Sequence, residues 1–198
     1  TGAVDGSYQG NLVFTHNAVG GETSIPVQME VNEEPQDIIK NVYFHAGWNL
    51  VSLNLQPEQN SVSMILRPLQ TAEHLIMAKD QYGKFYLPSE NFSNMDLWSI
   101  SEGYWVNVSE PYPLIVEGLT VASSEPIALR EGWQLVGYYP RQPMNVEAAL
   151  ASVTAELDFA KDEHGRFYSP DWDFNLMGYC FTGKGYIPKM REAAELVW

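Results

Sequence analysis

Three blocks of sequence occur twice in this chain, in the same order. Gly-Trp-Asn-Leu-Val at 47–51 returns as Gly-Trp-Gln-Leu-Val at 132–136, and Ala-Lys-Asp-x-x-Gly-x-Phe-Tyr-x-Pro occurs at 78–88 and 160–170. Gly-Tyr then recurs at 103–104 and 185–186, so the spacing between copies falls from 85 residues (47 to 132) to 82 (103 to 185). An ordered recurrence of this kind indicates an internal duplication, which constrains the fold more than any other feature.

Each copy has the pattern of a small β-rich module with one helix. The Trp-Asn/Gln-Leu-Val run after a glycine predicts a buried strand. Apolar residues at helical spacing predict a helix over 61–69, capped by Asn60 or Ser61, and another over 146–153 after Asn145. The turns at 80–83 and 162–165 end in glycine and should each close a hairpin. Further strands are expected over 75–78, 103–108 and 114–116.

The N-terminal part has a different pattern. Segments 6–15 and 23–31 read as two strands around the turn 17–21, which predicts a β-hairpin. An isolated hairpin is marginally stable, so it should either dock on the first module or end a sandwich domain. With junctions at 32–36 and 117–126, the predicted domains are a hairpin over 1–35, the first copy over 36–120 and the second over 121–198. The predicted fold class is α+β, mainly β.

In the second copy, Ile187-Pro188 replaces Trp105-Val106 of the first. Because proline cannot donate a ladder hydrogen bond, we expect that strand to lie at a sheet edge.

These residues resemble known bacterial modules. The segments 6–12 and 25–31 resemble the last two strands of the immunoglobulin-like domains of large bacterial surface and secreted proteins. The Gly-Trp-Asn-Leu-Val-Ser-Leu, Gly-x-Phe-Tyr-x-Pro and Gly-Tyr-Trp segments resemble uncharacterised tandem repeat modules near the C-termini of such proteins, in the Bacteroidetes–Chlorobi–Fibrobacteres group. The resemblance implies an extracellular or cell-envelope location and carries over no catalytic residue.

The net charge of −14 excludes several partners. Nucleic acids and anionic membranes are bound by basic residues, of which the chain has 11 against 25 acidic ones. No apolar run approaches the roughly 18 residues of a membrane helix, so no membrane insertion is expected. The single cysteine, Cys180, corresponds to Trp98 of the first copy and reads as a small buried residue.

No motif for chemistry is complete. The four histidines lie far apart, and the alternating oxygens of Asp171, Asp173 and Asn175 lack the glycine and glutamate of a calcium loop, so neither metal nor cofactor is expected. No nucleophile elbow or phosphate loop is present either. The sequence therefore predicts that the chain is not an enzyme and has no catalytic residue.

Aromatic side chains are the remaining candidates for ligand binding. Those that recur, among them Trp48 and Trp133, are expected in the module cores, where large rings bury most area. The non-recurring Trp98, Trp105 and Trp172 are then the candidate ligand-binding residues. The expected function is a non-catalytic structural or adhesive module pair of a bacterial surface or secreted protein, with other domains of that protein and a glycan or protein ligand as partners. The alternative is a carbohydrate-binding module that uses exposed Trp and Tyr.

Overall fold

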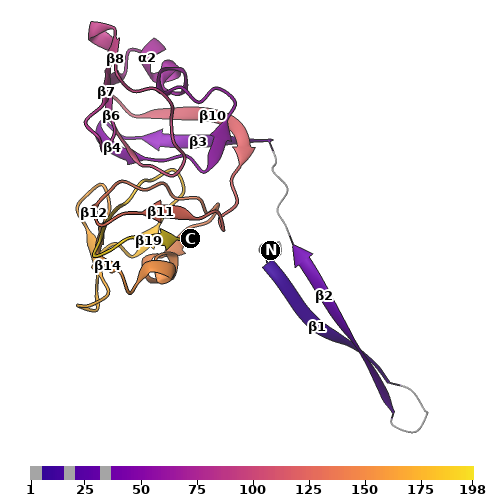
Figure 1. Ribbon diagram of the computed structural model, residues 1–198. Helices are drawn as coiled ribbons and strands as arrows, with labels where there is room; N and C mark the ends of the chain where they lie inside the picture. Colours follow the sequence, from indigo (N-terminus) through magenta and orange to yellow (C-terminus); the bar gives the residue numbers. More distant parts are fainter. Residues whose placement is uncertain (1–5, 16–20, 32–36) are drawn as a thin grey trace. The chain divides into compact units, whose positions relative to one another are not determined.

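The computed structural model describes residues 6–15, 21–31 and 37–198, and most of its regular structure is β-strand (Figure 1). The chain divides into two compact units, residues 1–34 and residues 35–198. Helices are few and short, as predicted for a mainly β chain.

The first unit is the predicted hairpin. Strand β1 (Gly6–Thr15) pairs antiparallel with β2 (Glu22–Val31), with Leu12 opposite Ile25 and Gly10 opposite Val27. Because side chains alternate along a strand, Leu12, Phe14, Ile25 and Val27 share one face. All four are exposed within this unit, so one face of the hairpin is apolar.

The first half of the second unit, residues 37–120, holds two sheets and two helices. One sheet has the order β4-β9-β6-β7-β8 and the other has the order β3-β10-β5. The elements are β3 (Asp37–Phe44), β4 (Gly47–Val51), β5 (Leu55–Pro57), α1 (Val62–Ile65), α2 (Arg67–Thr71), β6 (Leu75–Lys79), β7 (Phe85–Leu87), η1 (Pro88–Glu90), β8 (Phe92–Ser93), β9 (Tyr104–Val108) and β10 (Tyr112–Thr120).

The second half, residues 121–198, has a five-stranded sheet of order β12-β18-β14-β15-β16 and the two-stranded ladders β11-β19 and β13-β17. In both halves the chain visits the five-stranded sheet in the same order. The elements are β11 (Ile127–Leu129), β12 (Gly132–Trp133), β13 (Met144–Asn145), α3 (Val146–Ala149), η2 (Ala151–Val153), β14 (Leu157–Lys161), β15 (Phe167–Ser169), β16 (Phe174–Asn175), β17 (Tyr179–Cys180), β18 (Ile187–Met190) and β19 (Ala194–Leu196).

Local sequence fixes the helix starts and the hairpin turns. The Ser61 hydroxyl accepts a hydrogen bond from the Met64 N–H, and the Asn145 side chain accepts one from the Glu147 N–H. These are N-caps at the predicted positions. In each hairpin turn an aspartate accepts two backbone hydrogen bonds, at 2.8 and 2.9 Å to Asp80 and at 2.9 Å each to Asp162.

The helices of the first half cover one face of its five-stranded sheet. Apolar residues of α1 and α2, among them Val62 and Leu69, share a core with Ala78, Tyr86 and Val106 of the sheet. The Tyr86 hydroxyl donates a hydrogen bond to Gln70 of α2 at 2.7 Å, which places this tyrosine on the covered face. The side chains that alternate with Tyr86 therefore lie on the opposite, outer face.

The prediction of an edge strand at Pro188 is wrong. Strand β18 lies between β12 and β14, inside the sheet. The carbonyl of Pro188 accepts the Gln134 N–H at 3.1 Å, so the missing N–H of Pro188 also faces β12. Because this donor is missing, the ladder between β12 and β18 is short: β12 has two residues, whereas β4 in the first half has five.

The two halves contact each other through matched backbone hydrogen bonds. The Ser52 N–H donates to Gly183 at 3.2 Å, and the Gly137 N–H donates to Ser101 at 2.9 Å. Ser52 and Gly137 correspond in the repeat, as do Ser101 and Gly183. Each bond therefore has its counterpart in the opposite direction.

Side chains repeat this reciprocity. The Leu50 N–H donates to the Glu163 carboxylate at 3.1 Å, and the corresponding Leu135 N–H donates to Gln81 at 3.0 Å. The two halves thus contact each other through reciprocal hydrogen bonds.

Candidate functional site

The outer face of the second half's five-stranded sheet carries a continuous group of aromatic rings. Trp133 comes from β12, Phe159 from β14, Phe167 from β15 and Phe174 from β16, and Trp172 precedes Phe174. We call these five residues the aromatic face. Trp133 is 44% exposed and Trp172 is 66% exposed, so large ring areas meet solvent.

Contacts between the rings fix their arrangement. The planes of Trp133 and Phe159 are within 20° of parallel, with centroids 6.2 Å apart. Phe159 also meets Trp172 edge-on at 5.5 Å, and Phe167 lies 4.7 Å from Phe174. Since aromatic pairs in these geometries stabilise one another, the face is a preformed apolar surface.

Cationic side chains stand over this surface. The Lys161 ammonium lies 4.6 Å from the Trp133 ring centroid, and the Lys189 ammonium lies 5.9 Å from Trp133 and 5.2 Å from Phe159. Lys189 also forms an ion pair with Asp158 at 2.6 Å, and Arg191 pairs with Asp171. A ligand on the aromatic face would meet both ring faces and ammonium groups.

The first half has a smaller counterpart. Trp48 on β4 is 39% exposed, meets Trp105 edge-on at 6.4 Å, and has the Lys79 ammonium 4.7 Å from its ring centroid. Phe85 and Phe92 lie 5.1 Å apart farther along the same sheet. The Trp48–Lys79 pair occupies the positions of Trp133–Lys161 in the repeat.

The three tryptophans singled out from the sequence lie in different environments. Trp172 belongs to the exposed aromatic face, and Trp105 is half-buried beside Trp48. Trp98 is only 3% exposed, and its ring lies 4.0 Å from that of Tyr104 in the core. Trp98 therefore offers no surface for stacking in this structure.

The expectation that the recurring tryptophans lie in the cores is wrong. Trp48 and Trp133 begin their strands on the outer side of the sheet, and the polar neighbour points inward instead. The buried Asn49 amide donates to the carbonyls of His45 and Gly47, and the buried Gln134 amide donates to Arg130. The recurrence of Lys79 and Lys161 with the tryptophans is the sequence signal for this surface.

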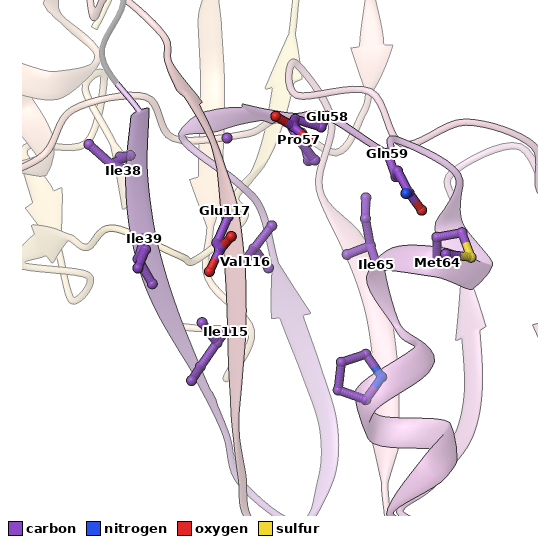
Figure 2. Close-up of a pocket in the computed structure, with 12 residues that line it drawn as sticks. Ile38, Ile39, Pro57, Glu58, Gln59, Met64, Ile65, Ile115, Val116 and Glu117 are labelled. Carbon is purple, nitrogen blue, oxygen red and sulfur yellow. The ribbon is translucent and has the colours of Figure 1, made fainter.

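The first half also has a groove. It has a volume of about 640 Å³ and lies between β3, β10 and helix α1 (Figure 2). Its lining is mostly apolar, with the Glu58, Gln59 and Glu117 side chains among the lining residues.

Titratable groups with strongly shifted pKa values lie in the cores. Burial raises the pKa of the Cys180 thiol and of the Tyr104 and Tyr139 hydroxyls to about 12, and raises that of Tyr186 as well. These groups are protonated at neutral pH and supply neither a thiolate nor a general base. Within 37–198 and the described hairpin residues, no three His, Cys, Asp or Glu side chains gather as metal ligands.

No family model, curated protein or solved structure matches the chain. None of the helices described is long and apolar enough to cross a membrane.

Proposed function

We propose that this chain is a non-catalytic adhesive module pair of a bacterial secreted or cell-surface protein, and that its aromatic face binds carbohydrate. The observation that carries the proposal is the exposure of Trp133 and Trp172 around Phe159 on the outer sheet face. A pyranose ring presents apolar C–H groups that pack on such rings, while its hydroxyls hydrogen-bond to polar neighbours.

The rigidity of the surface supports this assignment. Four of the five rings stand on paired strands, Trp172 lies in the turn before β16, and each ring contacts another, so little conformational entropy is lost when a ligand orders them. The second half is also held to the first by the reciprocal hydrogen bonds at Ser52 and Gly137. A rigid pair of this kind suits a module that presents a binding surface or spaces neighbouring domains.

We further propose that the two halves are copies of one module. The support is that the two five-stranded sheets share one strand order, and that the β3-β10 ladder of the first half corresponds to the β11-β19 ladder of the second. Val42 pairs with Leu114 in the first half, and Ile127 pairs with Leu196 at the corresponding positions of the second. The apolar face of the hairpin supports its origin in an immunoglobulin-like domain, and with it an extracellular or cell-envelope location.

A binding screen tests the proposal. The intact chain is titrated with soluble neutral and acidic polysaccharides, followed by calorimetry and by tryptophan fluorescence. Trp133→Ala should weaken binding about tenfold or more, because removing a tryptophan at a binding centre costs about 2 kcal/mol or more. Tyr43→Ala is the matched control, since Tyr43 is an exposed aromatic residue of β3, outside the aromatic face.

The outcomes separate the two functional classes. Binding that Trp133→Ala removes and Tyr43→Ala leaves intact supports the carbohydrate site. If no polysaccharide binds, the carbohydrate site is refuted and the purely structural or protein-adhesive function is left. Circular dichroism of each variant checks that the sheets are retained.

A further inference from the structure

Among residues 37–198, the two lysines that stand over the recurring tryptophans have no partner of opposite charge. Several basic side chains of this acidic chain form ion pairs: Lys84 with Asp96, Arg166 with Asp162, Lys184 with Glu163, Lys189 with Asp158 and Arg191 with Asp171. Within residues 37–198, Lys79 and Lys161 form neither an ion pair nor a side-chain hydrogen bond. Two ammonium groups are thus left over at equivalent places in the two halves.

Their position relative to the rings is the same in both halves. Each lysine is the last residue of a strand that is separated from the tryptophan's strand by one other strand. The side chain crosses that middle strand, so that the Lys79 ammonium lies 4.7 Å from the Trp48 ring centroid and the Lys161 ammonium lies 4.6 Å from the Trp133 ring centroid. An exposed tryptophan ring with a lysine ammonium over it therefore occurs at the same place in both halves, although other parts of the two halves differ in sequence.

We propose that the ligand of the carbohydrate site is an acidic glycan, with a uronate residue stacked on each of Trp48 and Trp133. This inference rests on the proposed carbohydrate-binding function. The pyranose ring packs on the indole, and its carboxylate pairs with the Lys79 or Lys161 ammonium. A neutral sugar would use the ring alone and leave the ammonium without a charged partner.

The local charge supports an anionic ligand despite the acidic chain. Beside the aromatic face, Lys189 pairs with Asp158 and Arg191 pairs with Asp171, whereas the Lys161 ammonium lies over Trp133. At physiological ionic strength charges are screened beyond about 8 Å, so the distant carboxylates contribute little there. Each site has only one or two lysine ammonium groups. These can pair with the separated carboxylates of an acidic glycan, whereas the closely spaced phosphates of a nucleic acid require many basic residues.

The test compares two oligomers with the same sugar chain, one carrying carboxylates and the other their uncharged methyl esters. The full chain is titrated calorimetrically with oligogalacturonate and with the same oligomer methyl-esterified, at low salt and at physiological salt. The acid form should bind roughly two- to fivefold more tightly, as expected for exposed ion pairs, and this preference should shrink with added salt. Polyglutamate is included as an acidic polymer without sugar rings.

Variants separate the sugar contact from the charge contact. The double variant Lys79→Gln/Lys161→Gln should lose the preference for the acid form and still bind the ester. Arg67→Gln is the control, because Arg67 lies on α2 against the covered face of the first sheet and also has no ion pair among residues 37–198.

Each outcome decides the inference. Equal binding of acid and ester, or tighter binding of the ester, overturns it and leaves the carbohydrate site in place. A preference that Arg67→Gln reduces as much as the lysine variant, or that polyglutamate reproduces, overturns it as nonspecific charge attraction. Absence of binding by both oligomers and by the neutral polysaccharides refutes the carbohydrate site itself.

Discussion

Gly137 lies at a close approach between the backbones of the two halves, and alanine should not fit there. A Cβ at this position would lie 2.1 Å from the carbonyl oxygen of Ile100 and 3.4 Å from that of Glu102. The backbone angles of Gly137 are open to alanine, so the effect of Gly137→Ala is steric alone. Because the opposing atom is backbone oxygen, a side-chain rotation cannot relieve the overlap.

The expected loss follows from two contributions. Overpacking costs about 1–3 kcal/mol. The shift also weakens the 2.9 Å hydrogen bond from the Gly137 N–H to Ser101, which contributes about 1 kcal/mol. Together these destabilise the unit by about 2–4 kcal/mol, which for a unit of this size lowers Tm by roughly 4–16 °C.

Thermal unfolding followed by near-ultraviolet circular dichroism of the buried tyrosines measures this change. Gly10→Ala is the control, because no atom lies within 4 Å of its added Cβ and Gly10 belongs to the hairpin unit. A Tm of Gly137→Ala equal to that of the unsubstituted chain would refute the close approach of the halves. A separate early transition would show that the halves unfold independently.

Three further outcomes follow from buried groups. Ser52→Ala should cost about 1–3 kcal/mol in urea unfolding, because the Ser52 hydroxyl accepts from the Tyr138 N–H at 3.1 Å and donates to the Lys184 carbonyl at 2.7 Å; an unchanged midpoint would contradict these bonds. Burial raises the pKa of Cys180 from 9.0 to about 12, and those of Tyr104 and Tyr139 from 10.0 to about 12. The unfolded chain therefore releases these protons first as pH rises, so Tm should be insensitive to them below pH 9.0 and should fall between pH 9.0 and about 12. Iodoacetamide at pH 8 should label Cys180 only after unfolding, as measured by mass spectrometry, and fast labelling of the native chain would argue against its burial.

Local signals in the sequence predicted the short-range structure well. Asp80 and Asp162 mark their turns because an aspartate at this place satisfies backbone N–H groups two and four residues on. Ser61 and Asn145 mark helix starts for the same reason. Cys180 is fully buried, as its correspondence to Trp98 indicated.

The surface was harder to predict, because alternation along a strand defines two faces without saying what covers each. Trp48 and Leu50 lie on the same side of β4, yet Trp48 is exposed whereas Leu50 is fully buried. The difference comes from the second half, whose Gly185 N–H donates to the Leu50 carbonyl at 3.0 Å. A contact between residues this far apart in sequence leaves no local pattern.

The sequence alone determined the strand-rich character, the hairpin turns and the helix caps, since each depends on neighbours within a few positions. Tertiary structure alone decided which rings face solvent, that β18 lies inside its sheet, and that the halves pack reciprocally. These features depend on strand order and on long-range burial, where a tryptophan beside a glycine can belong equally to a core or to a surface.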